Sequence, residues 1–111
     1  MTSASPSFPE DRPRRFRATV HGTIFAGRDR HLEELSPGDS LRLIPGPARE
    51  EVPEVWVHLV SGDPVGHLPP EIGAWLAPWL HEGGTAEARA LKVKGADVPS
   101  WRRLLLEVHC V

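Results

Sequence analysis

The chain has 111 residues, 40% of them hydrophobic, and a formal net charge of -2. This length allows one domain but not two, and the charge lacks the basic excess typical of nucleic-acid-binding proteins. Cys110 is the single cysteine, which excludes an intrachain disulfide and suits a reducing cytoplasm. No apolar run approaches the roughly 20 residues of a membrane span, so we expect a cytoplasmic protein with no membrane partner.

The N-terminal stretch has a different composition from the rest of the chain. Residues 1–15 are rich in proline, serine and arginine and offer almost nothing to bury. This composition predicts a flexible tail, followed by one ordered domain over residues 16–111. The first strand of that domain is expected from Phe16, because Phe16, Ala18 and Val20 alternate with polar residues as far as Gly22.

The middle of the chain predicts a short helix and three strands. Residues 28–35 can make two helical turns, and residues 39–45 alternate as a strand does. A loop of proline, glycine and glutamate follows. Residues 55–60 form the clearest strand, and the turn Ser61-Gly-Asp-Pro leads into a short returning strand at 65–68. The two strands therefore predict a hairpin.

A tryptophan-rich helix is expected next. It begins at Pro69-Pro70, where proline is tolerated, and ends at Gly83-Gly84. Its apolar residues recur at helical spacing, and Pro78 inside the run is expected to kink the helix or divide it in two.

The last third of the chain predicts two strands. In residues 85–94 the apolar parity changes after Ala90, which predicts a bulge there. Residues 101–111 read as a long final strand with Leu104, Leu106 and Val108 on one face. The whole pattern predicts a mostly β fold: a small, six-stranded, largely antiparallel OB- or SH3-like barrel with one short helix and one longer, proline-interrupted helix.

The sequence lacks a recognisable catalytic set. No stretch matches a glycine-rich phosphate loop, and no serine stands in a nucleophile elbow. The six histidines are scattered without metal-ligand spacing. We therefore expect no enzymatic activity, no cofactor and no metal.

Two residues of the 55–68 hairpin are candidates for binding. Trp56 alternates with the inward-facing Val55 and Val57, so it is predicted to lie on the surface, where it could stack on a base or contact a protein. His67 either caps a backbone group or borders a binding site. Basic residues also cluster locally, which predicts either a basic patch or a solvated surface of mixed sign; they are Arg12, Arg14, Arg15, Arg17, Arg28, Arg30, Lys92, Lys94, Arg102 and Arg103.

The order of elements resembles the HIRAN domain. Gly38-Asp39 precedes an apolar strand and a proline-containing loop, and Val65-Gly66-His67-Leu68 follows a glycine turn and leads into a helix that begins with proline. Upstream, VHGTIFAG resembles the first strand of the family, with Phe25 where an aromatic residue is common. The resemblance covers about residues 18–95 and fits the bacterial members in which this domain stands alone.

The resemblance implies a small β-barrel that grips the 3′ end of single-stranded DNA in a repair-related context. Phe25 would then be the stacking or pocket-wall residue, and Arg28 or Arg30 would contact phosphate. His67 would lie beside the pocket and donate to phosphate or sugar. Stacking combined with phosphate neutralisation is the usual basis of single-strand recognition.

One loop departs from the family pattern. DNA-binding members carry a loop resembling Asn-Pro-Tyr-Asp, whereas residues 48–54 here read AREEVPE. Glu51 or Glu54 could accept a hydrogen bond from a hydroxyl, but the carboxylates of this loop would repel phosphate. The leading hypothesis is a non-enzymatic DNA-binding module. The alternative is a protein-interaction or oligomerisation module that kept the barrel and lost the DNA-end pocket.

Overall fold

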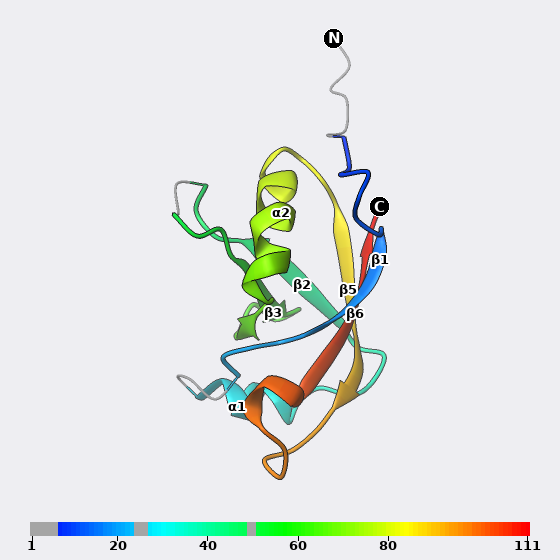
Figure 1. Ribbon diagram of the computed structural model, residues 1–111. Coiled ribbons are helices and arrows are strands. Elements are labelled where there is room, and N and C mark those ends of the chain that lie inside the picture. Colours follow the sequence, from blue (N-terminus) through cyan, green and yellow to red (C-terminus); the bar gives the residue numbers. More distant parts are fainter. Residues whose placement is uncertain (1–6, 24–26, 49–50) are drawn as a thin grey trace.

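The computed structural model describes residues 7–23, 27–48 and 51–111. Six strands form one antiparallel sheet in the order β1-β6-β5-β2-β3-β4. The strands are β1 (Arg15–Thr19), β2 (Ser40–Pro45), β3 (Val55–Leu59), β4 (Pro64–His67), β5 (Ala86–Val93) and β6 (Leu104–Cys110), and the helices are α1 (Arg28–Leu32) and α2 (Pro70–His81). Figure 1 shows the sheet curled into a partial barrel with α2 beside it, which confirms the predicted fold class.

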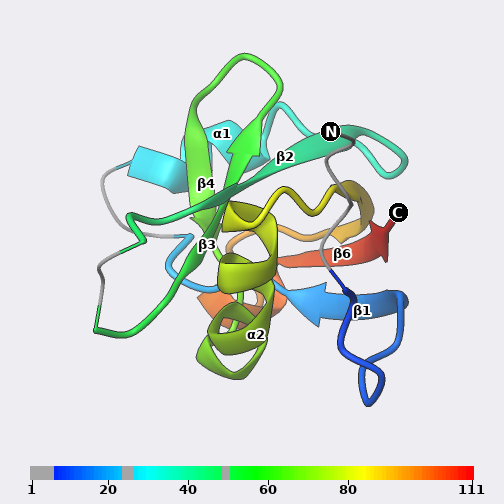
Figure 2. The ribbon, with the colours of Figure 1, turned by 90° about the horizontal axis from the view of Figure 1, so that it is seen from above.

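The two edges of this sheet meet at a single point. Strand β1 ends at Thr19, but the chain continues and His21 forms an isolated bridge with His67 at the end of β4. The sheet is therefore a strongly curled ribbon, and within the described part of the chain this bridge joins its two edges. The view from above shows the strands around the curl and α2 among them (Figure 2).

The core follows the predicted alternation. Burial alternates along β3 and β6, where Val55 and Val57 of β3 and Leu104, Leu106 and Val108 of β6 are fully buried. Each strand thus gives one face to the core and one to solvent, as an antiparallel sheet with one covered face does.

Helix α2 contributes a second layer to the core. Leu76, Ala77 and Trp79 are buried, and the helix lies against β2 and β3. The helix runs without a break through Pro78. The sequence allowed either a kink or a division of the helix at this proline, and the division is wrong. Proline removes one hydrogen-bond donor, but the Pro78 carbonyl still accepts from the Glu82 amide and the last turn stays closed.

The predicted bulge in β5 is confirmed. The pairing of β5 with β6 shifts between Ala90 and Lys92, so Leu91 is the extra residue. After the shift Val93 pairs with Leu104 and packs against the core, as the parity change required. The final strand is shorter than expected, because residues 100–102 form a 3-10 turn before β6 begins at Leu104.

The N-terminal segment contacts the domain. Phe8, within the expected tail, packs edge-to-face on Trp75 at 5.6 Å and on Trp79 at 5.2 Å between ring centroids. Strand β1 begins at Arg15. The division of the chain into a tail and a domain stays a prediction. Among the described residues, no helix has the length and apolar character needed to cross a membrane.

Candidate nucleic-acid interface at the barrel closure

The candidate site lies at the bridge between His21 and His67, which joins the segment after β1 to the end of β4. The His21 amide donates to the His67 carbonyl at 2.8 Å, and the His67 amide donates to the His21 carbonyl at 3.0 Å. The two imidazole rings lie nearly parallel, 26° apart, with centroids separated by 6.1 Å. Two segments that are far apart in sequence thus present adjacent imidazoles.

Gly66 makes this close approach possible. A Cβ at Gly66 would collide with the His21 carbonyl oxygen and with Val20 Cγ1, and the residue has a φ of 156°. The absence of a side chain therefore lets the backbone of β4 reach the end of β1.

Trp56 and Arg28 complete the site. Trp56 pairs with His67 across the β3–β4 ladder, and their rings meet edge-to-face at 5.6 Å and 73°. The Arg28 guanidinium lies 4.9 Å above the Trp56 ring, and its Nη1 donates to the Gly22 carbonyl at 2.9 Å. A cation over an indole contributes about 0.5–2 kcal/mol of attraction. We call His21, Arg28, Trp56 and His67 the closure cluster.

One ring nitrogen of His67 is hydrogen-bonded to the protein, and the other can bind a ligand. Nδ1 lies 3.0 Å from the Leu68 carbonyl, which only accepts, so Nδ1 carries the proton of this hydrogen bond. The expected backbone cap is therefore present, and it leaves Nε2 free to accept in the neutral ring. Gly22 keeps this nitrogen accessible, because a Cβ there would lie 3.3 Å from His67 Nε2 and 3.2 Å from Arg28 Nη1.

The closure cluster is rich in cationic and cation-forming groups. Within the described part of the chain, Arg28 has no carboxylate within 4.0 Å, and its buried Nε has no hydrogen-bond partner. Its guanidinium is held by an indole and a carbonyl rather than by an acid. Such an arrangement offers stacking surfaces and donors to an anionic ligand. No set of three or more His, Cys, Asp or Glu among the described residues could hold a metal.

The structure brings some of the predicted residues together and not others. Arg28, Trp56 and His67 converge, although Trp56 is half-buried beneath Arg28 rather than openly exposed. Arg30 is exposed on α1, outside the contacts of the cluster. Phe25 lies outside the described residues.

The two glutamate candidates differ in their surroundings. Glu51 is exposed in the loop before β3. Glu54 is half-buried directly before β3, where its carbonyl accepts from the Gly46 amide at 2.8 Å. Glu54 has the same strand parity as Trp56 and precedes it by two residues, so both side chains lie on the same face of the sheet.

The sequence did not indicate the contacts of two further residues, His21 and Trp101. The parity of His21, opposite to the inward Ala18 and Val20, indicated an outer position, but nothing local indicated its bridge to His67. Trp101 is 52% exposed in the 3-10 turn, with the Arg102 guanidinium 5.8 Å from its ring. The hydroxyl of buried Thr23 donates to the Ser100 carbonyl at 3.0 Å, which ties this turn to the segment that follows Gly22.

Other hollows on the described surface lie away from the closure cluster. One of about 240 Å³ is lined largely by proline and alanine, from the loop before β3 and the end of α2. Another of about 510 Å³ lies over β1, β6, β5 and β2. Val65–Leu68 line neither.

Comparison with known proteins identifies one solved structure with a similar fold. No family model matches the sequence, and no curated protein matches it either. The fold is similar to the crystal structure of the HIRAN domain of human HLTF, with a TM-score of 0.56 and 17% sequence identity. The match covers 86% of this chain and 72% of that one. The chain therefore has a HIRAN-like fold.

Proposed function

We propose that this protein is a non-enzymatic module that binds DNA, as single strands or 3′ ends, at the closure cluster. The observation that carries the proposal is the convergence of Arg28, Trp56 and His67 from three separate segments of the chain. The HIRAN-like fold supports it, and a repair-related context follows from the same resemblance.

The cluster supplies the three contacts that a strand end needs. A base stacks on the layer formed by Trp56 and the overlying Arg28 guanidinium, because both present flat π surfaces. Arg28 neutralises a phosphate in this proposal, and His21 adds a hydrogen-bonding group beside His67. The free Nε2 of neutral His67 accepts a hydrogen bond from the terminal hydroxyl.

Further residues extend this site in the proposal. In this proposal Arg30, two residues after Arg28 on α1, adds a second phosphate contact, and Phe25 is the proposed pocket-wall residue. Glu51 and Glu54 are the alternatives to His67 as hydroxyl acceptor, and Glu54 is the better of the two because it has the same strand parity as Trp56. Trp101 offers a second stacking surface through its link to Thr23.

A fluorescence anisotropy titration tests the proposal. A labelled oligonucleotide of about 12 nucleotides, within the range of roughly 4–16 bound per OB fold, is titrated at low salt. Trp56→Ala is expected to weaken binding by about 10-fold or more, since stacking contributes roughly 1–3 kcal/mol per base. His81→Ala is the control, because the His81 ring lies at the end of α2, outside the closure cluster, and bonds to the Gly46 carbonyl.

Two results of this titration would contradict the proposal. An absence of binding by the wild type at about 100 µM protein, the weak end of nonspecific affinity, would end it. Equal loss of affinity in the Trp56 and His81 variants would show that the closure cluster is not the site.

One observation favours the alternative of a protein-interaction or oligomerisation module. The hollow of about 240 Å³ between the loop before β3 and α2 is lined by Pro47, Pro53, Ala77 and Pro78, an apolar surface of the kind that proteins bury against partners. Sedimentation velocity over a range of concentrations tests for self-association through it. A strict monomer, or a dimer that survives Pro47→Glu, would count against this candidate.

A further inference from the structure

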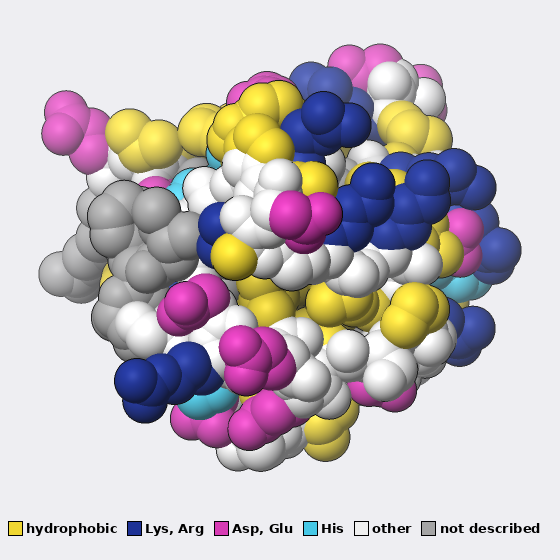
Figure 3. Space-filling view, turned by 90° about the horizontal axis from the view of Figure 1, so that it is seen from below, with side chains coloured by type: hydrophobic (Ala, Val, Ile, Leu, Met, Phe, Trp, Pro, Cys, Tyr) yellow, Lys and Arg dark blue, Asp and Glu magenta, His cyan; other side chains and the backbone are white. Residues whose placement is uncertain are grey.

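The outer face of the sheet carries most of the positive charge that the strands expose. Five basic residues of three strands lie on it; they are Arg15, Arg17, Arg42, Arg89 and Lys92. Two carboxylates share it, Glu87 and Glu107, so the net charge of this face is +3 in a chain whose formal charge is -2. In the space-filling view from below, most Lys and Arg side chains gather on the right-hand side (Figure 3).

Strand β1 connects this face to the closure cluster. Ala18 and Val20 are buried, so Arg15, Arg17 and Thr19 face outward and His21 continues the same row. Residues that share a face of a strand are about 6.6–6.8 Å apart, so the row from Arg15 to His21 extends over roughly 20 Å. Its last member stacks against His67. The basic row therefore runs directly into the candidate site.

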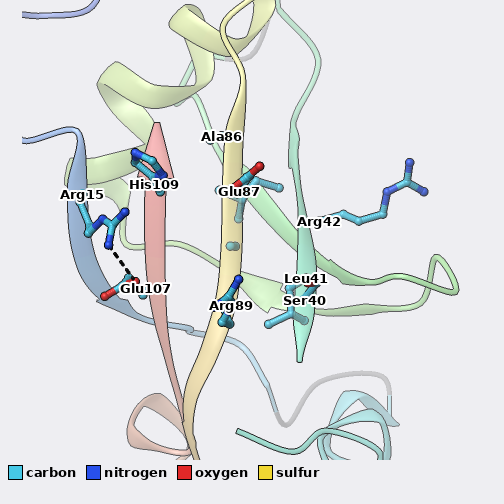
Figure 4. Close-up of a pocket in the computed structure, with 11 residues that line it drawn as sticks. Arg15, Ser40, Leu41, Arg42, Ala86, Glu87, Arg89, Glu107 and His109 are labelled. Atoms are coloured by element: carbon cyan, nitrogen blue, oxygen red, sulfur yellow. Dashed lines mark ion pairs between the residues drawn. The ribbon is translucent and has the colours of Figure 1, made fainter. Parts of the chain in front are cut away.

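At its other end the row opens into a groove. Strands β2 and β5 pair at Ser40 with Arg89 and at Leu41 with Ala88. Backbone hydrogen bonds continue on the side of Asp39 and Ala90, and the strands diverge on the side of Leu43 and Ala86. The groove at this split has a volume of about 510 Å³. Figure 4 shows Arg15 and the groove's other lining side chains projecting from β1, β6, β5 and β2.

The acids of this face do not neutralise its arginines. Glu107 lies 3.9 Å from Arg15, a partly exposed pair of the kind that contributes little to stability. Arg17, Arg42 and Arg89 have no carboxylate within 4.0 Å among the described residues. These three guanidinium groups are available to an external anion.

We propose that a single-stranded nucleic acid whose end occupies the closure cluster continues along the outer row of β1 and enters the groove between β2 and β5. Arg17, Arg15 and Arg89 hold its phosphodiester backbone. This inference rests on the proposed function. The even spacing of the cations along one strand and their continuity with an aromatic cluster favour a nucleic-acid strand over an acidic peptide.

The test compares oligonucleotides of two lengths that share the same 3′ end. A trimer has only two internal phosphates. An oligonucleotide of about 12 nucleotides is longer than the row of roughly 20 Å even at the roughly 3.4 Å per nucleotide of a duplex strand, so it can reach the groove. The double variant Arg17→Gln/Arg89→Gln is expected to lower the affinity for the longer oligonucleotide and to leave the affinity for the trimer unchanged. Its slope of log affinity against log salt should be less steep by about 1.4, or 0.7 per phosphate contact.

A matched control removes the same charge elsewhere. Arg12→Gln/Arg14→Gln changes two exposed arginines that lie over Trp75 and Phe8, and it should leave the salt slope unchanged. Circular dichroism checks that both double variants fold.

The outcomes separate this inference from the proposed function. If the wild type binds both lengths with equal affinity, or if both double variants behave alike, the track along β1 is wrong and binding at the closure cluster stands. If neither oligonucleotide binds, the proposed function fails and the track fails with it. A polyglutamate peptide that binds as tightly as the longer oligonucleotide, and that no longer binds to the Arg17→Gln/Arg89→Gln variant, would show that the face binds polyanions in general. That result overturns the nucleic-acid assignment.

Discussion

The His21 carbonyl oxygen occupies the position in which a side chain on Gly66 would stand. A Cβ at Gly66 would overlap this oxygen and Val20 Cγ1, and both belong to the segment that closes the barrel against β4. The closure, the two stacked imidazoles and the placement of Trp56 beside them all depend on this contact between main chains.

Gly66→Ala is therefore expected to destabilise the protein. Overpacking of this kind costs about 1–3 kcal/mol, and the substitution also forces a positive φ on alanine. Urea denaturation measures the loss. Gly95→Ala is the control, because its Cβ would meet only the Asp97 carboxylate at 3.5 Å, and its stability should stay within about 0.5 kcal/mol of wild type. Equal effects of both substitutions would contradict the tight closure.

His67 is expected to distinguish strand ends that carry a 3′ hydroxyl from those that lack it. With Nδ1 bonded to the Leu68 carbonyl, Nε2 is the acceptor, and one hydrogen bond contributes about 0.5–1.5 kcal/mol. The wild type should therefore prefer a 3′-hydroxyl oligonucleotide over its 3′-deoxy analogue by about 2- to 10-fold. His67→Ala should abolish this preference. If the preference survives in this variant and disappears in Glu54→Gln, the acceptor is the glutamate.

Arg28 and Arg30 are expected to contribute unequally to binding. Arg28 lies over Trp56 and bonds to Gly22, whereas Arg30 is exposed and outside these contacts. Hydrogen bonds to charged groups contribute about 1.5–3 kcal/mol, so Arg28→Ala should lower DNA affinity about 10-fold or more. Arg30→Ala should produce a smaller loss that disappears at high salt. Arg28→Lys retains the charge but not the planar group, and only partial affinity is expected from it. A larger effect at Arg30 would refute this assignment.

Phe8 is expected to anchor the N-terminal segment. Its ring contacts Trp75 and Trp79 edge-to-face, and each such pair contributes about 0.5–1.5 kcal/mol beyond burial. Phe8→Ala should lower the free energy of unfolding by about 1–3 kcal/mol, whereas the exposed Glu10→Ala should change it by less than about 0.5 kcal/mol. An unchanged stability in Phe8→Ala would support a fully flexible tail over residues 1–15.

Cys110 is expected to make stability fall at high pH. Burial raises the pKa of its thiol from 9.0 to about 11, and the Arg14 charge offsets part of this rise. The folded state therefore keeps the proton that the unfolded state releases above pH 9. The contribution, up to about 2–3 kcal/mol, is complete below pH 9 and is lost as the pH rises through 11.

Urea denaturation at about pH 8 and about pH 10.5, on either side of the pKa of an unperturbed thiol, measures this effect. Cys110→Ala should be less stable at the lower pH because it leaves a cavity, and it should lose less stability between the two values. If the wild type and Cys110→Ala lose the same free energy of unfolding between the two pH values, groups other than Cys110 cause the loss.

Local patterns in the sequence determined most of the elements. The alternation in β3 and β6 predicted which residues are buried, because side chains on a strand point to opposite faces in turn. The parity change after Ala90 predicted the bulge for the same reason. Strand parity indicated Trp56, and the resemblance to the HIRAN domain indicated His67 and Arg28.

Only the tertiary structure decided how these elements meet. The bridge between His21 and His67 depends on the curl of the whole sheet, and no local period encodes which edges will touch. The position of Arg28 over Trp56 and that of Phe8 on Trp79 likewise join segments separated by many residues. Strand periodicity is a property of neighbouring residues, whereas a binding surface on a curled sheet arises from register and twist accumulated over all six strands.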